Sequence, residues 1–89
     1  MSTISLQVTY RKGRPFAAYI YLASRAGDTS TRVEEITADL LVDYAADGRP
    51  LGIEIVTPEA VSTEAILEVF DELGLGRPAA EELAPLRAA

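Results

Sequence analysis

The sequence predicts an α+β fold: an antiparallel β-meander of four to five strands packed against one C-terminal amphipathic helix, plus a short helical tail. Three observations predict it. Apolar and polar residues alternate over the first two thirds of the chain, turn residues separate these runs, and residues 61–73 repeat apolar side chains at helical spacing. A length of 89 residues fits one small domain, which we place at residues 1–76, with a C-terminal tail at 77–89.

The first predicted element is a strand that leads into a hairpin turn. Residues 4–10 alternate apolar and polar side chains over seven positions, which is typical of a half-buried strand. The pattern breaks at residues 11–15, where Gly13 can adopt positive φ and Pro15 cannot donate to a central ladder. We therefore expect a hairpin turn there.

The second predicted strand spans residues 16–23 and is rich in aromatic side chains. Strand alternation places Ile20 and Leu22 on one face and Tyr19 and Tyr21 on the other. If the helix covers the isoleucine face, the two tyrosines form an exposed pair suited to a protein interface or homodimer. The alternative is that this face is not available, because neighbouring strands pack against the tyrosines within the sheet or because Leu83 and Leu86 of the tail cover them.

A loop at residues 24–30 leads to a weaker third strand at 31–36. Val33 and Ile36 differ in parity, so they cannot both point to one face of a regular strand. A β-bulge or an early strand end resolves the conflict.

The clearest hairpin joins residues 39–44 to residues 51–56. An Asp-Gly pair at 47–48 separates the two alternating runs, which is the strongest short-range hairpin signal. Burial of the apolar positions puts Asp43 and Glu54 on the opposite face. We interpret them as solvated carboxylates, because two are a thin ligand set for a hard cation.

A helix follows, with two candidate starts. Thr57 can cap a helix that has Pro58 at its first position, and Ser62 is a second possible cap. Gly74 followed by Leu75 predicts a Schellman ending. The predicted buried stripe consists of Val61, Ala65, Ile66, Val69, Phe70 and Leu73.

The tail at 77–89 contains one possible short helix, residues 78–86. Pro85 is expected to cut that helix off. Two outcomes are open for the tail: Leu83 and Leu86 dock on the domain, or the tail frays.

Composition excludes several classes of protein. The chain has no histidine and no cysteine, so it cannot use a thiolate nucleophile, a histidine base or a Cys/His zinc site of its own. We expect a non-enzymatic protein without cofactor or metal. The first ten residues lack a signal-peptide pattern and no stretch is long enough to span a membrane, so we expect a cytoplasmic protein.

Charge is unevenly distributed along the chain. Residues 1–32 have five basic side chains and one carboxylate, a net of +4, whereas residues 33–89 have three basic side chains and thirteen carboxylates, a net of −10. The total is −6. An asymmetry of this kind bears on partners and solubility rather than on fold.

Two charged groups are candidate binding residues. The polar face of the helix presents Glu64, Glu68, Asp71 and Glu72, which would suit a basic partner protein or simply be solvated. Arg11, Lys12 and Arg14 lie near aromatic residues at the first hairpin, a pattern that nucleic-acid-binding surfaces also show. The acidic remainder of the chain makes an ordinary solvated turn the better interpretation.

One segment of the chain resembles a known family. The run LVDYAADGRPLGIEI at residues 41–55, preceded by AAYIYL at 17–22, is similar to the prokaryotic family "domain of unknown function 2283", over about residues 10–56. The resemblance implies a β-meander with a short following helix and brings no catalytic residues. Some members look like partners of small toxin-type proteins.

The chain departs from that family in two places. Residues 11–16 are basic and then aromatic, where the family usually has acidic residues, and the chain continues from Glu59 to Ala89 beyond the signature. Both departures weaken the inference that this chain shares a partner with members of that family.

Together these observations predict a protein-interaction module, antitoxin-like or inhibitor-like, that binds a basic partner protein such as a small toxin-type protein. The alternatives are a homo-oligomer that uses Tyr19 and Tyr21 or a free strand edge, and a weak nucleic-acid binder that uses the basic hairpin.

Overall fold

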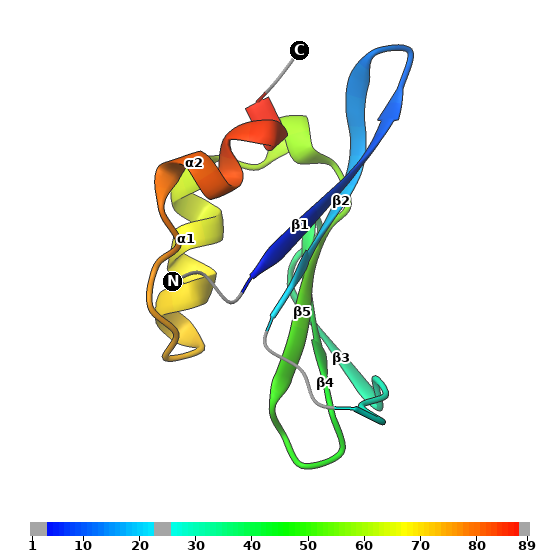
Figure 1. The fold of residues 1–89 in the computed structure, drawn as a ribbon, viewed down its shortest axis with the longest axis vertical. Coiled ribbons are helices and arrows are strands. Elements are labelled where there is room, and N and C mark those ends of the chain that lie inside the picture. The colour runs from blue at the N-terminus through cyan, green and yellow to red at the C-terminus, as the bar shows by residue number, and fades with distance from the viewer. Residues whose placement is uncertain (1–3, 23–25, 88–89) are drawn as a thin grey trace.

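The computed structural model describes residues 4–22 and 26–87 as five strands followed by helices (Figure 1). The last residue of the predicted second strand (Ala23) and the first two residues of the predicted loop (Ser24 and Arg25) lie outside the described residues. In chain order the elements are β1 (Ser5–Arg11), β2 (Arg14–Tyr21), β3 (Arg32–Thr37), β4 (Leu40–Tyr44), β5 (Pro50–Ile55), the 3₁₀ turn η1 (Pro58–Ala60), α1 (Thr63–Glu72), α2 (Ala80–Leu83) and the 3₁₀ turn η2 (Ala84–Arg87).

The predicted fold class, an antiparallel α+β domain, is confirmed. The strand order is β1-β2-β5-β4-β3, with every neighbouring pair antiparallel, so it departs from a simple meander at one point. β5 rather than β3 lies beside β2. The composition of β3 explains this, because its sequence RVEEIT is exposed at five of six positions and suits a sheet edge rather than the centre.

The centre of the sheet is its most apolar part. Ile20 of β2 lies directly opposite Ile53 of β5, and both are fully buried. Ala18 lies opposite Ile55 in the same pair of strands. The strand alternation predicted from the sequence therefore places this apolar face toward the helices, where Ile66, Val69 and Phe70 of α1 close the core.

The hairpins and bulges follow from the local sequence. Lys12 and Gly13 both have positive φ, as a two-residue type I′ hairpin requires. β3 pairs Glu35 with Leu41 but Thr37 with Leu40, so Ile36 is the extra residue of a β-bulge. The conflict of parity between Val33 and Ile36 is thus resolved by a bulge, which confirms the prediction.

Both candidate helix starts are used, by different elements. Thr57 precedes η1, with Pro58 at its first position and no side-chain cap. Ser62 caps α1, because its hydroxyl accepts a hydrogen bond from the Ala65 amide at 3.1 Å. The predicted Schellman ending is present: the amide of Leu75 donates to the Phe70 carbonyl at 2.9 Å and Gly74 has a φ of 73°.

The C-terminal tail packs on the domain. Leu83 and Leu86 are 2% and 3% exposed and belong to the same core as the sheet. The α-helix α2 ends at Leu83, two residues before Pro85, as predicted, and the chain continues through the proline as the 3₁₀ turn η2; proline fits the first turn of η2, where its missing amide is not needed. The Arg87 guanidinium donates to the carbonyls of Pro58, at 2.9 Å, and of Val61, which fastens η2 to η1 and the residue that follows it.

Because Leu83 is buried in the core, Leu83→Ala should lower the free energy of unfolding by about 2–4 kcal/mol. Urea denaturation followed by circular dichroism measures this change. Glu81→Ala is the control, since Glu81 lies in the same short helix with its side chain exposed. A loss below about 1 kcal/mol for Leu83→Ala would show that the tail contributes little to the core.

Candidate functional site

The helices cover only one face of the sheet (Figure 1). The opposite face carries a group of side chains from four strands, which we call the tyrosine face. Its members are Gln7 of β1, Tyr19 and Tyr21 of β2, Asp43 of β4, and Gly52 and Glu54 of β5. Tyr19 lies directly opposite Glu54 and Tyr21 opposite Gly52, so the register of β2 with β5 assembles this surface.

Tyr19 is held in place on this face. Its hydroxyl donates a hydrogen bond to Oδ2 of Asp43 at 2.6 Å, across the intervening strand β5. Its ring lies over Gly52, where a Cβ atom would overlap the phenol. Gly52 is therefore required for close approach, which is the usual reason for glycine inside a strand. Neither contact was predicted, although a glycine in the run LGIEIV was the available signal.

Tyr21 is the exposed partner of Tyr19. The two ring centroids are 4.7 Å apart with their planes at 59°, a tilted arrangement that aromatic pairs favour. The Tyr21 hydroxyl donates to Oε1 of Gln7 at 2.9 Å, and 47% of the residue remains accessible. The two sequence-based alternatives thus apply to different residues: Tyr19 packs within the sheet, and Tyr21 is available for contact.

The electrostatics of the face are acidic. Burial, the hydrogen bond to Asp43 and the negative charges of Asp43 and Glu54 all raise the pKa of Tyr19 above its usual value, with burial the largest cause. Glu54 is exposed and Asp43 is half-buried. An open depression of about 270 Å³ lies beside the tyrosines, bounded by Gln7, Thr9, Ala17 and Glu54.

The acidic helix face is less available than its sequence indicates. Arg77, just beyond the end of α1, bonds Asp71 at 2.6 Å and Glu64 at 3.1 Å, and it lowers the pKa of Asp71. Glu68 and Glu72 are exposed and form no ion pair within the described ranges. The helix and the tyrosine face lie on opposite sides of the sheet, so the structure does not join the predicted partner-binding residues into one surface.

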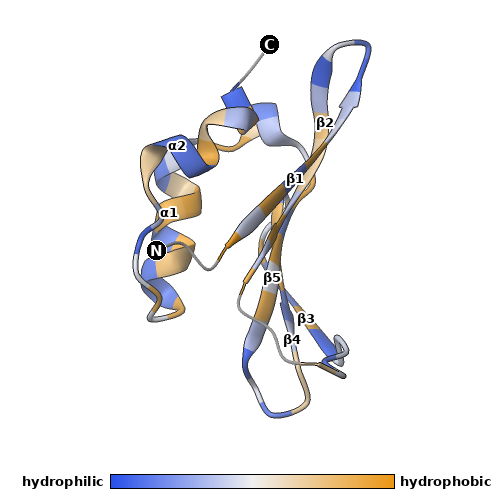
Figure 2. Cartoon of the chain, in the orientation of Figure 1, coloured by the Kyte–Doolittle hydropathy of each residue, from blue (hydrophilic) through white to orange (hydrophobic). Residues whose placement is uncertain are grey.

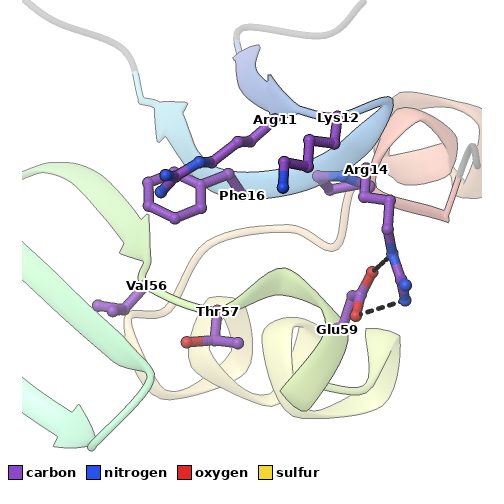
Figure 3. A pocket seen from close by; sticks show the side chains of 8 residues that line it. Arg11, Lys12, Arg14, Phe16, Val56, Thr57 and Glu59 are labelled. Carbon is purple, nitrogen blue, oxygen red and sulfur yellow. Dashed lines mark hydrogen bonds and ion pairs between the residues drawn. The ribbon is translucent and has the colours of Figure 1, made fainter.

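The three basic residues of the first hairpin line a second hollow, of about 550 Å³, beside the connection from β5 to η1 (Figure 3). Arg14 is paired with Glu59 through two bonds of 2.8 and 2.9 Å. The Arg11 guanidinium lies over the Phe16 ring, 5.4 Å from its centroid, and Lys12 sits at the turn. We call this hollow the hairpin groove.

Phe16 and Val56 form the apolar part of the hairpin groove, and Phe16 supplies the aromatic neighbour that the sequence predicts beside the basic residues. They are 53% and 40% exposed. Phe16 is the extra residue of a β-bulge, since Thr9 pairs with Ala17 while Tyr10 pairs with Pro15. The bulge sets the direction of this side chain, and Pro15 in the sequence was the signal that regular pairing stops here.

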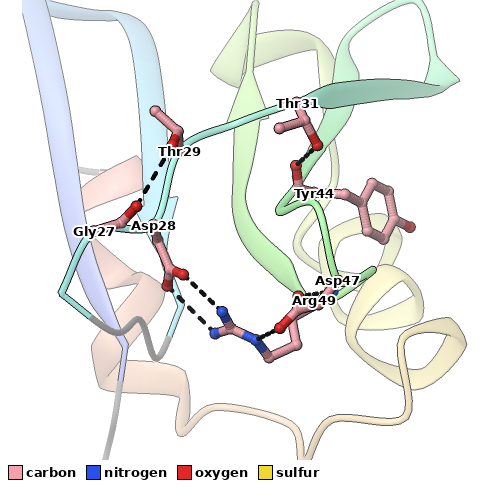
Figure 4. A network of polar contacts seen from close by, with 7 residues as sticks. All are labelled: Gly27, Asp28, Thr29, Thr31, Tyr44, Asp47 and Arg49. Carbon is pink, nitrogen blue, oxygen red and sulfur yellow. Dashed lines mark hydrogen bonds and ion pairs between the residues drawn. The ribbon is translucent and has the colours of Figure 1, made fainter.

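A third polar cluster fixes two loops together (Figure 4). Arg49 bonds Asp28 at 2.6 Å and Asp47 at 2.7 Å, joining the segment before β3 to the β4–β5 hairpin. The Asp47 side chain also accepts from the Arg49 amide at 3.1 Å, the local turn bond expected for an aspartate at this position. Within residues 4–22 and 26–87, no group of three or more potential metal ligands gathers in one place.

The fold and this face define a class: a small two-layer α+β domain, open on one side of its sheet, in which an aromatic pair lies among carboxylates. Residues 17–57 match the family model described as "Protein of unknown function (DUF2283)". The match confirms the resemblance seen in the sequence. No curated protein and no solved structure matches the chain.

The matched segment contains β3, β4, β5 and all of β2 from Ala17 onward. Every member of the tyrosine face except Gln7 lies inside it, whereas the basic residues of the hairpin groove and both α-helices lie outside it. Among the residues that the structure describes, no helix has the length and apolar character needed to cross a membrane.

Gly52→Ala should destabilise the protein by about 1–3 kcal/mol, because the added methyl group displaces the Tyr19 ring from its place on β5. Chemical denaturation measures the loss. Gly76→Ala is the matched control, since a Cβ there meets nothing within 4 Å and the residue does not have positive φ. Equal stabilities for the two variants would contradict the close packing of Tyr19 on Gly52.

The raised pKa of Tyr19 predicts a dependence of stability on alkaline pH. The unfolded chain loses the Tyr19 proton near pH 10, whereas the folded chain retains it to higher pH, so folding stability falls as pH rises above about 10. Tyr19→Phe removes this contribution. The unfolding free energy of wild type relative to the variant should therefore decrease as pH rises above about 10; parallel pH profiles would contradict it.

Proposed function

We propose that this protein is a non-enzymatic protein-interaction module that binds a basic partner protein through the tyrosine face. The observation that carries the proposal is the one-sided fold. The helices cover a single face of the sheet, and the uncovered face presents Tyr21 beside Tyr19, with the carboxylates of Asp43 and Glu54 on the same surface. None of the six members of this face is basic.

The chemistry of the face suits protein recognition. Tyrosine offers a large apolar ring with a polar end and is enriched at interfaces. Tyr19 is already immobilised by Asp43 and by its packing on Gly52, and it supports the Tyr21 ring. Because these rings are ordered before binding, less conformational entropy is lost when a partner covers them.

The acidic character of the face favours a cationic partner. Glu54 is exposed, and Glu35, which lies opposite Leu41 on the same side, adds a further carboxylate. With a net charge of −6 the whole chain attracts a basic protein at long range. A small basic toxin-type protein, held by an antitoxin-like or inhibitor-like module, fits this description.

The position of the face within the family segment supports its use. Tyr19, Tyr21, Asp43 and Glu54 all fall within the matched residues 17–57, while the acidic residues of α1 fall outside. Arg77 also neutralises part of the charge on that helix. The sheet face is therefore the better candidate than the helix face named from sequence.

Two other functions have less support. A homodimer formed face to face would bring Glu54 and Asp43 of one copy near the same carboxylates of the other, which costs free energy. Nucleic-acid binding through the hairpin groove would have to use Arg11 and Lys12, because Arg14 is paired with Glu59. A polyanion would also be repelled by the rest of an acidic chain.

The test is co-expression with the product of the adjacent gene, followed by light scattering behind a sizing column at low salt. We expect a stoichiometric complex that Glu54→Lys weakens at least tenfold, because the change reverses a charge at the centre of the face. Glu68→Lys is the matched control, since it makes the same change on the exposed side of α1.

The two variants separate the candidate surfaces. Loss of the complex in Glu68→Lys but not in Glu54→Lys would assign binding to the helix instead. If no complex forms with the wild type at low salt, the interaction with the neighbouring product is excluded and the proposal fails.

A further inference from the structure

The two edges of the sheet differ in how they are protected. β3 forms one edge and carries Arg32, Glu34 and Glu35, together with a bulge at Ile36, which are features that discourage further strand pairing. β1 forms the other edge, with no charge before Arg11 and no proline, and its pairing with β2 shifts register only between Thr9 and Tyr10. Figure 2 shows this strand alternating between orange and pale or bluish colours up to the blue hairpin tip.

The core is also incomplete beside β1. Ile4, Leu6 and Val8 point toward the core but are only partly buried, whereas Ala18 and Ile20 of the neighbouring β2 are 4% and 0% exposed. Within the described part of the chain, no strand pairs with the outer side of β1, and in Figure 1 no element passes in front of it. An additional strand there would cover these side chains and pair with the outer backbone groups of Ser5–Arg11.

We propose that β1 pairs antiparallel with β1 of a second copy of the chain, giving a twofold-symmetric dimer with a continuous ten-stranded sheet. The uncharged run limits the register. With the twofold axis at Gln7, residues 4–10 of one copy face residues 10–4 of the other, and every position in the pair is uncharged. A register centred on Val8 would instead draw Arg11 and Lys12 into the ladder.

The side chains fit this register. Leu6 of one copy faces Val8 of the other on the core side, so the partly buried apolar residues cover each other. The two Gln7 side chains meet at the axis on the opposite face. Each Gln7 already accepts a hydrogen bond from Tyr21 through Oε1. Its side-chain amide hydrogens can donate to Oε1 of the second Gln7, which has a further lone pair. The cationic hairpins, which contain Lys12, point to opposite ends of the dimer.

The charge and size of the interface set how it behaves. Each copy carries a net charge of −6, so salt should strengthen the association by screening repulsion. One pair of strands buries less surface than the roughly 1,200–2,000 Å² of a stable complex, so the dimer is a weak one. Crosslinking is therefore the most direct test. Because the chain has no cysteine, an introduced cysteine is the only thiol that can react.

Gln7→Cys should form a disulfide-linked dimer under mild oxidation. Directly opposed residues of antiparallel strands have Cα atoms about 4.5–5.5 Å apart, within the range of a disulfide. Ser5→Cys alone should not crosslink, because residue 5 faces residue 9 and the two copies of residue 5 lie roughly 14 Å apart. A mixture of Ser5→Cys with Thr9→Cys should crosslink as a heterodimer.

Sedimentation equilibrium gives an independent measurement. Gln7→Lys places two like charges at the axis and should weaken self-association at least tenfold, whereas Val33→Lys adds the same charge at the β3 edge and should not. A wild type that stays monomeric at its solubility limit would overturn the proposal. So would equally efficient crosslinking of Gln7→Cys and Ser5→Cys.

Discussion

The pairing of β2 with β5 is the constraint on which the rest of the structure depends. It places Ile20 against Ile53 at the fully buried centre of the sheet, and the same register sets Tyr19 opposite Glu54 and Tyr21 opposite Gly52 on the other face. The core that α1 covers and the tyrosine face are therefore two sides of one strand pairing. A shift of one residue would send the isoleucines to solvent and the tyrosines into the core.

The sequence predicts those features that depend on near neighbours. The alternation of β1 and β2, the hairpins, the bulge at Ile36 and the glycine ending of α1 all follow from local patterns, and all are present. The position of β5 beside β2 does not follow from such patterns. It depends on which of two distant strands, β3 or β5, is the better buried neighbour for β2. The polar composition of β3 explains why β5 takes that place, but only when both arrangements are compared in three dimensions.

The candidate site was predicted in part for the same reason. Tyr19 and Tyr21 were identified because strand parity places them together, but the partners that distinguish their roles, Asp43 and Gly52, come from β4 and β5. The charge asymmetry of the sequence is also reduced by folding. Arg14 pairs with Glu59, Arg49 with Asp28 and Arg77 with Asp71, so basic side chains neutralise carboxylates from other segments of the chain. The charge counted along the sequence therefore overstates the charge that a partner meets.

The central strand pairing also has a consequence for folding kinetics. Ile20 and Ile53 meet across a long stretch of chain, while β3, β4 and β5 are joined by short hairpins. Closing the long loop costs entropy before the buried contacts compensate, so we expect β3–β4–β5 to form first and the β1–β2 hairpin to dock in the slower step. Arg49, which ties the segment before β3 to the β4–β5 hairpin, shortens the part of that loop that must still be ordered.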